Sequence, residues 1–347
     1  MPRARAAAAR VIRAEGAPIA LVLAVLVGAF MLAAPHVFLG YRIYMAFLAS
    51  VPPLLVLAAG LTLVIAAGEI DLSFPSVIAF SGFLFAWAFK TYELTWAALL
   101  LALLGGALIG LINGILVAVI GIPSIIATLA TQFFWGGITT VLSGGLSYAI
   151  RNIDEYWVHT ILVGRIGPLP VEALWSTAVA VLLWFVLNRH RFGEHLLFIG
   201  DNVSVAEVVG VNVVREKVKL FTLMGLLAAF AAVVLTAENK NFFNTQGSGF
   251  LLTVMAAVFI GGTSIFGGKA TIVGSYLGAY LIGMIEAGLV ATGMQGFWVR
   301  AVVGLVFLAA VVFHLTMEDP TRLRRFRQLR LPGRLLRRPA PQAHERP

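Results

Sequence analysis

A glycine-rich stretch at 261–270, which reads Gly-Gly-Thr-Ser-Ile-Phe-Gly-Gly-Lys-Ala, has the composition that comes nearest to a phosphate-binding loop. Such a loop needs a glycine five positions ahead of its Gly-Lys pair and a hydroxyl after the lysine to hold Mg²⁺. Thr263 and Ala270 occupy those two positions in this chain. We therefore expect a tight turn between helices at this point, and no ATP binding by this chain itself.

The other residue groups that catalysis or metal binding would need are missing from the sequence. The six histidines never form a close pair within an apolar run, and His190 and His195, which share a polar loop, have no acidic motif beside them. The chain has no cysteine, which excludes thiolate metal sites, disulfides and Cys nucleophiles. Neither a metalloprotease motif nor a Ser-His-Asp set is present. The sequence predicts a non-catalytic chain that binds no cofactor and no metal.

A few polar residues lie inside apolar runs, where they could contact a solute. Glu286 is the clear acid among them, and it could be a proton relay, a substrate contact, or a residue near the outer mouth paired with Arg300. The last two readings are favoured, because one acid without an intramembrane partner makes a poor relay. The other members of this candidate substrate path are Asn113, Thr128, Thr131 and Gln132. Each of them could instead form a hydrogen bond between helices.

The elements that must position these residues are long apolar runs. Hydrophobic residues make up 60% of the 347 and charged residues only 12%. A helix needs about 20 mostly apolar residues to cross the hydrocarbon core, and in lipid every backbone amide must be paired. The sequence therefore predicts an all-α polytopic membrane protein with about ten transmembrane helices. The runs are 17–35, 46–68, 77–89, 96–120, 125–143, 173–188, 218–237, 250–262, 271–293 and 297–317.

Two of these runs, 77–89 and 250–262, are too short to cross a bilayer alone. Either their flanking residues extend them, or they are broken helices that line a cavity. The sequence leaves both readings open.

Basic residues fix the expected orientation, because they resist translocation across the membrane. Most of the 25 Lys and Arg residues fall in segments that are cytoplasmic if the N-terminus is inside. The predicted division is a basic cytoplasmic segment 1–16, a transmembrane domain 17–317 with a cytoplasmic loop 189–219, and a basic, disordered cytoplasmic tail 318–347. The net charge of +9 reflects this asymmetry and an Arg-rich tail beside anionic lipid, rather than nucleic-acid binding.

Three segments carry local signals of packing or capping. Glycines at 106, 110 and 114 place small surfaces on one helix face, which favours internal packing over a subunit contact. After the run 46–68, Asp71 or Ser73 can accept hydrogen bonds from free amides of the next helix, whose first turn suits Pro75.

The cytoplasmic loop contains a third signal. Asn202 or Ser204 can cap a short helix through Val209, with Gly210 ending it. Such a helix presents several valines, which either enter a groove of a partner protein or lie against the bundle of this chain.

The sequence motifs of these segments resemble those of permeases of ribose-type ABC importers, the branched sugar-importer family. The resemblance covers about Gly60 to Val312. It is carried by Gly-x-Ile-Asp-Leu-Ser (Gly68, Ile70, Asp71, Leu72 and Ser73), by Ser76–Ala79, by Asn113-Gly114, by 122–129, and by a glycine signature (Gly261, Gly262, Thr263, Ser264, Gly267 and Gly268). The sequence departs from the family at Phe74-Pro75, where Val-Gly is common.

The cytoplasmic loop completes the resemblance, which implies that this loop docks on an ATPase subunit. The residues concerned are Gly200, Asn202, Val205, Ala206, Glu207, Val208, Val209, Gly210, Val211 and Asn212. Val208 stands where the family often has Arg or Leu, which implies a specialised docking surface.

The resemblance also implies the function. The chain would be the permease subunit of a bacterial ATP-driven importer for a monosaccharide such as ribose, xylose or a related sugar or polyol, in the inner membrane. Its partners would be a cytoplasmic ABC ATPase, an external sugar-binding protein, and a second permease chain in a homodimer. Two alternatives remain: an ion- or proton-coupled carrier, and an ABC permease for branched-chain amino acids. The Asp71-Leu72-Ser73 string favours sugars over amino acids.

Overall fold

The computed structural model describes residues 15–93 and 95–318 of the chain, and these residues are mainly helical. Most of the predicted basic ends, 1–16 and 318–347, lies outside the described residues. The helices of the first half are α2 Ala17–Ala33, α3 Pro35–Phe38, α4 Tyr41–Ser50, α5 Pro52–Ala66, α6 Phe74–Tyr92, α7 Thr95–Ala118, α8 Ser124–Ser143 and α9 Trp157–Val163. Those that follow are α10 Val171–Arg189, α11 Arg191–Asp201, α12 Val203–Val208, α13 Val213–Glu238, α14 Phe250–Ile260, α15 Ile272–Ala291 and α16 Phe297–Glu318.

Each apolar run of the sequence contains a helix, but about ten full spans are not confirmed. Within the described residues, six helices are long and apolar enough to cross a membrane: α6, α7, α8, α10, α13 and α15. A seventh span is possible if α4 and α5 form one unit, because these helices are bent by 50° at a short break. The expectation of one continuous span over 46–68 is therefore wrong. Pro52 and Pro53 follow the break directly, and proline cannot donate the hydrogen bond that would continue a helix.

The two short runs have different outcomes. Flanking residues extend the run 77–89 to the 19 residues of α6, from Phe74 to Tyr92. The run 250–262 stays short, because α14 has only 11 residues, about half of a bilayer span. The segment in front of each of these two helices is not helical.

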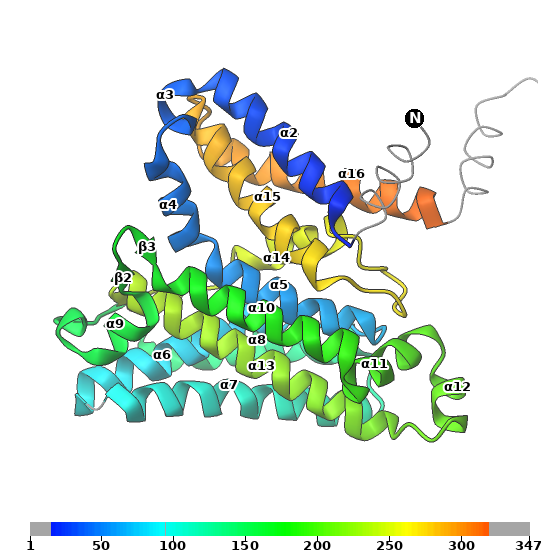
Figure 1. Cartoon of the computed structure of the whole chain (residues 1–347). Coiled ribbons are helices and arrows are strands. Elements are labelled where there is room, and N and C mark those ends of the chain that lie inside the picture. The colour runs from blue at the N-terminus through cyan, green and yellow to red at the C-terminus, as the bar shows by residue number, and fades with distance from the viewer. Residues whose placement is uncertain (1–14, 94, 319–347) are drawn as a thin grey trace, which may run out of the picture.

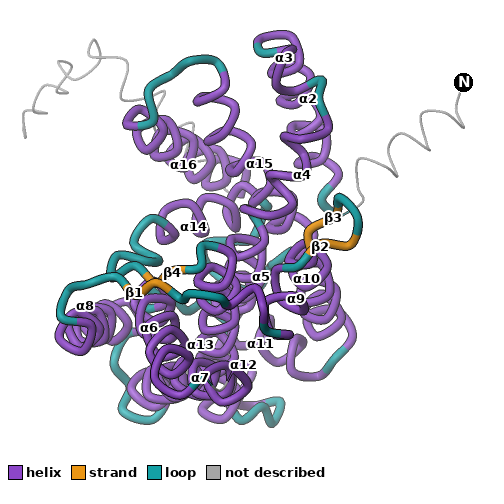
Figure 2. Tube along the Cα trace, turned by 90° about the vertical axis from the view of Figure 1, so that its left-hand side faces the viewer, coloured by secondary structure: helices purple, strands orange, loops and turns teal. Residues whose placement is uncertain are grey.

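The helices form two groups around a central one. All fifteen residues of α5 are buried. Figure 2 shows α6, α7, α8 and α13 on one side and α2, α3 and α16 on the other, with α5 and α14 between them. The helix pair α11 and α12 lies at one end of the molecule, and the first residues of α2 and the last of α16 point to the same end (Figure 1).

The opposite end carries small strands and the short helix α9. Strands β1 (Tyr148–Ala149) and β4 (Asn241–Phe242) form an antiparallel pair. Strands β2 (Arg165–Ile166) and β3 (Leu169–Pro170) form a second antiparallel hairpin. We call this the strand end and the other the α12 end.

The glycines of α7 pack against α13 inside the chain, which confirms the expectation of internal packing. A Cβ at Gly106 would meet Ala229 and the carbonyl oxygen of Gly225, and a Cβ at Gly110 would collide with the backbone of Phe221. The two helices therefore touch backbone to backbone, a contact that only the small residues of one face allow.

We expect Gly110→Ala to destabilise the chain by about 1–3 kcal/mol, because the added methyl group must push α7 away from α13. The matched control is Gly137→Ala on α8, where nothing lies within 4 Å of the added Cβ and helix propensity improves. The measurement is thermal unfolding of both variants in detergent. A Tm for Gly110→Ala equal to that of the control would contradict the close approach.

Candidate functional site

The non-helical segment between α5 and α6 runs inside the bundle rather than over its surface. The backbone N–H of Ile70 donates to the Ser124 hydroxyl (3.2 Å), and the N–H of Leu72 donates to the Thr128 hydroxyl (3.0 Å). Since Ser124 and Thr128 are one turn apart at the start of α8, the segment climbs along that helix into the bundle. An extended segment is tolerated at this depth only because side chains of neighbouring helices pair its amides.

A closed network of polar side chains fixes the end of this segment. The Asp71 carboxylate accepts from the backbone N–H (2.7 Å) and the hydroxyl (2.6 Å) of Ser73. The Asn113 amide of α7 donates to the Ser73 hydroxyl (2.7 Å) and accepts from the Thr131 hydroxyl of α8 (2.7 Å). All four residues are buried. We name Asp71, Ser73, Asn113 and Thr131 the polar knot, and it ties α6, α7 and α8 together.

The polar knot explains why the sequence has the motif Asp-Leu-Ser at 71–73. Asp71 pairs the backbone N–H of Ser73, the residue directly before α6, while Pro75 occupies the first turn, where its missing N–H is harmless. The Ser73 hydroxyl accepts a hydrogen bond from the Asn113 amide and donates one to the Asp71 carboxylate. Neither role could be performed by an apolar residue, since each would leave a buried polar group unpaired.

The candidate substrate-path residues fall into three places. Asn113, Thr128 and Thr131 belong to these hydrogen bonds between elements. Gln132 lines a cavity. Glu286 is half-buried on α15 and forms no ion pair with Arg300.

The cavity beside Gln132 has a volume of about 230 Å³. Its polar side chains come from α6 (Ser76), α8 (Gln132) and the segment before α14 (Asn244, Thr245, Gln246 and Ser248). The last four residues were not among the candidate substrate-path residues of the sequence. The usable signal was a cluster of Asn, Gln, Ser and Gly ahead of an apolar run too short to span a membrane.

At the α12 end, three backbones meet in a joint of glycines. A Cβ at Gly200, near the end of α11, would collide with the Ala66 carbonyl of α5 and with the N–H of Gly268. The Gly268 N–H also donates to that carbonyl (3.0 Å). The turn at 261–270 is tight as expected, with the Ser264 N–H donating to Lys269 O (2.9 Å). We name this contact of Ala66, Gly200 and Gly268 the glycine joint.

The glycine signature is also tied to the bundle above the joint. The Thr62 hydroxyl of α5 bonds to the Ser275 hydroxyl of α15 (2.7 Å), which lies 3.5 Å from the hydroxyl of Thr263. These residues are buried, so the turn, α5 and α15 share one polar contact. A displacement of the 261–270 turn must therefore shift α5 and α15 as well, because closely packed interiors transmit strain.

Helix α12 follows directly after the joint and presents an exposed apolar face. The Asn202 side chain caps it by accepting from the Val205 N–H (3.1 Å), and Gly210 (φ 89°) follows its end, as the sequence predicts. Ala206 is fully buried against the chain, while Val208 is 88% and Val205 55% exposed. The helix is therefore held by one face, and its valines have no cover within the described residues.

An ion pair and a second cap hold the return from α12 into α13. The Lys217 ammonium lies 2.5 Å from the Glu69 carboxylate, beside the end of α5. The Asn212 side chain accepts from the Arg215 N–H (2.9 Å) at the first turn of α13. The chain is thus attached on both sides of α12, at Gly200 and at Lys217, to the region where α5 ends.

Charged residues cluster at the strand end. The Lys240 ammonium lies 3.2 Å from the Asp154 carboxylate, and Arg165 lies 3.8 Å from Glu238. A backbone hydrogen bond, with Lys240 adding to it, holds the pKa of Asp154 below its usual value. Partial burial lowers the pKa of His159, and the positive charge of Lys240 acts in the same direction. These groups shape a polar surface rather than a buried reaction centre.

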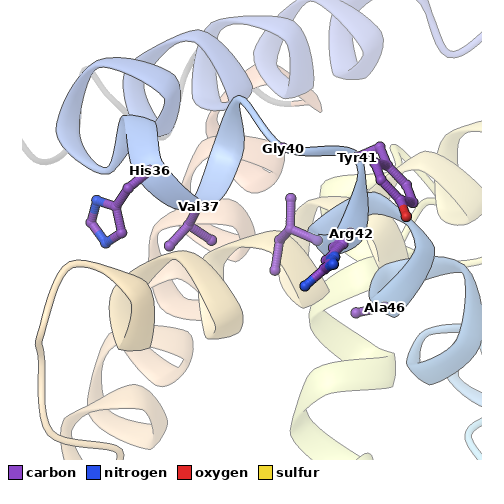
Figure 3. Close-up of a pocket in the computed structure, with 7 residues that line it drawn as sticks. His36, Val37, Gly40, Tyr41, Arg42 and Ala46 are labelled. Carbon is purple, nitrogen blue, oxygen red and sulfur yellow. The ribbon is translucent and has the colours of Figure 1, made fainter.

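A second cavity, of about 450 Å³, lies where α3 passes into α4. Its walls are mostly apolar, and His36 and Arg42 stand at opposite sides of it (Figure 3). Because these two side chains do not converge on one point, the cavity lacks the arrangement of a solute site.

Comparison with known proteins assigns the chain to a family of transport permeases. The family model described as the permease component of branched-chain amino acid transport systems matches residues 43–311. The chain belongs to this permease family. The matched range contains the polar knot, the cavity beside Gln132, the glycine joint and α12.

Individual relatives narrow the resemblance to sugar-type importers. The chain is 32% identical to the ribose import permease protein RbsC of Escherichia coli over 261 residues, which is 74% of this chain and 80% of that protein. It is 35% identical to RbsC of Bacillus subtilis over 256 residues, 74% of this chain and 79% of the relative. The autoinducer 2 import system permease protein LsrC of Yersinia pestis is 32% identical over 261 residues, 75% of this chain and 73% of LsrC.

The polar knot predicts the effect of one substitution. Asn113→Leu keeps the side-chain volume but removes both bonds to Ser73 and Thr131, so we expect it to cost about 1–3 kcal/mol of stability. Asn188→Leu is the control, since Asn188 is exposed and bonds only within its own helix. Thermal unfolding in detergent measures both, and a Tm for Asn113→Leu as high as that of the control would show that the knot contributes nothing.

Proposed function

We propose that this chain is the membrane-spanning permease subunit of an ATP-driven importer for a monosaccharide such as ribose, xylose or a related sugar or polyol. Membership of the permease family and the import functions in the names of its relatives support this. The chain itself carries out no catalysis, and a separate ABC ATPase supplies ATP hydrolysis. The observation that carries the proposal is α12, a capped helix with uncovered valines in the loop between the halves of the chain.

The coupling route follows from the contacts of α12. An ATPase groove would take Val205, Val208 and Val209, which are exposed. Motion of α12 passes to α11, and from Gly200 directly to the end of α5 and the 261–270 turn. Because these contacts are made between backbones, they have little room to yield, and α5 must move with the loop. Such movement would rock the helix groups between outward- and inward-open states.

The remaining assignments complete this arrangement. The α12 end and both termini face the cytoplasm, the strand end faces outward, and the membrane is the bacterial inner membrane. An external sugar-binding protein delivers the solute at the strand end, and two copies of the chain form the pathway. The excess of basic residues in the segments of the α12 end supports this orientation.

The rival mechanism is an ion-coupled carrier, and the described residues contain few of the ionisable groups that such a carrier needs. Glu286 has no ion-pair partner among the described residues, and a relay needs a chain of such groups. For the branched-chain amino acid alternative, the distinguishing observation is that the residues lining the Gln132 cavity carry no charge to pair with an ammonium or a carboxylate.

Val205→Asp tests the docking helix. A carboxylate in an apolar groove is poorly tolerated, so we expect ATP-dependent uptake by the reconstituted transporter to fall by about tenfold or more, with insertion and Tm unchanged. The control is Ile166→Asp, which is 62% exposed at the strand end.

A second variant removes the helix end rather than its face. Gly210→Pro forbids the positive φ of residue 210 and should uncouple ATP hydrolysis from uptake in the same way. Normal coupling in both variants would refute the docking role of α12.

A further inference from the structure

Each half of the chain has a non-helical segment directly ahead of one of its apolar helices. In the first half, a non-helical segment precedes α6, and in the second, the segment 243–249 precedes the 11-residue α14. In membrane transporters, short or interrupted helices in corresponding positions of two halves mark the place where a solute binds. The two interruptions meet in this structure: Gly247 (φ 94°) lies against the Pro75 carbonyl of α6, where no Cβ would fit.

The cavity of about 230 Å³ beside Gln132 lies at this meeting point. The polar knot lies next to it, since Thr131 precedes Gln132 and the Ser76 hydroxyl donates to Ser73 O (2.7 Å). Gln132 is near the middle of the 20-residue α8, so the cavity lies about halfway along this helix, and the exposed residues Thr245 and Ser248 stand at its opening. It is smaller than the 300–1,000 Å³ or so typical of sites for drug-sized ligands, which suits a small solute.

Two side-chain amides of the cavity lining, those of Gln132 and Asn244, are not fully paired within the described residues. Oε1 of Gln132 is shielded from solvent, and no donor among the described residues reaches it. The Asn244 carbonyl accepts from Thr140 (3.3 Å) and Ser143 (3.4 Å) of α8, which leaves its NH₂ group to donate. A hydroxyl group both donates and accepts, so hydroxyl groups of a solute in this cavity can pair with amides of this kind.

Contacts outside the cavity hold its walls in place. The Gln246 side-chain amide donates to the Thr236 hydroxyl (2.9 Å) and to Ala232 O (3.2 Å) of α13. It lies against Gly82 of α6, where a Cβ would collide with it. Gln246 therefore anchors the segment 243–249, while Asn244 and Ser248 remain at the cavity. The Phe133 ring adds an apolar surface to this lining.

We propose that this cavity binds an uncharged, polyhydroxylated solute of monosaccharide size, with the Gln132 and Asn244 side-chain amides as its hydrogen-bonding groups. The inference rests on the proposed function and assigns the solute site within it. An ammonium or carboxylate would enter without a counter-charge, which desolvation makes costly, whereas hydroxyl groups match the amides. One face of Phe133 suits the C–H side of a sugar ring.

The absence of cysteine from the sequence allows a direct binding test on the full chain. Ser248→Cys places one thiol at the cavity, and its rate of modification by a small, water-soluble methanethiosulfonate reports access. We expect D-ribose, D-xylose, D-glucose or myo-inositol at high concentration to slow the reaction by about threefold or more, and L-leucine to leave it unchanged. Ile166→Cys, exposed at the strand end, should be modified at one rate under every condition. Failure of all four polyols to protect, or equal protection by L-leucine, overturns the proposal.

Transport distinguishes the site from the wider function. With the reconstituted transporter, Gln132→Leu should lower the kcat/KM of uptake by about tenfold, the effect of losing one hydrogen bond to the solute. The control is Gln295→Leu, an exposed glutamine away from the cavity. If wild-type uptake requires ATP but Gln132→Leu transports normally, the site is wrong and the importer assignment stands. If wild-type uptake needs no ATP, the proposed function itself fails.

Discussion

The structure depends on pairing the backbone of a segment that is not helical yet runs inside a helical bundle. Helix α5 stops at Ala66, and the next helix begins only at Phe74. The amides of Ile70 and Leu72 would be unpaired in an apolar interior if Ser124 and Thr128 did not supply hydroxyl groups. Because each unpaired buried amide costs several kcal/mol, the Ser124 and Thr128 hydroxyls of α8 are needed to stabilise this segment.

The hydrogen bonds that pair the segment between α5 and α6 also fix the structure at both of its ends. At the inner end, the polar knot fixes the start of α6 beside Gln132 and leaves room for a polar cavity between α6, α8 and the segment before α14. At the other end, the chain passes Gly68 and Glu69, where the glycine joint and the Lys217 ion pair attach α11 and α13. One continuous stretch of backbone therefore runs from the glycine joint beside α12 to the cavity. This is a route along which a force applied at α12 could change access to a solute.

Much of this architecture could be predicted from the sequence, because the features concerned depend on residues that are close together in the chain. Apolar runs, the Asn202 cap, the positive φ at Gly210 and the tight 261–270 turn depend on neighbouring residues, and the structure has all of them. The break between α4 and α5 was missed even though Pro52 and Pro53 marked it. That signal is ambiguous, since proline occurs within membrane helices when neighbouring groups pair the freed carbonyl.

What the sequence could not predict were partners far apart in the chain. Whether Asn113 faces a solute or Ser73 depends on how α7 packs on α6, and spacing along α7 does not contain that information. The position of 243–249 against the bundle is fixed by contacts of Gly247 with Pro75 and of Gln246 with Thr236. Periodicity detects neither contact, so the segment resembled an ordinary outer loop.

The central claim is that this chain moves solute only when a separate ATPase drives it through α12. The most direct measurement is uptake of labelled pentose into liposomes that contain the purified chain alone, with and without an imposed proton gradient. The account predicts no accumulation against a gradient in either case, and accumulation only after the ATPase, ATP and the binding protein are added. Uphill uptake by the chain alone would contradict it.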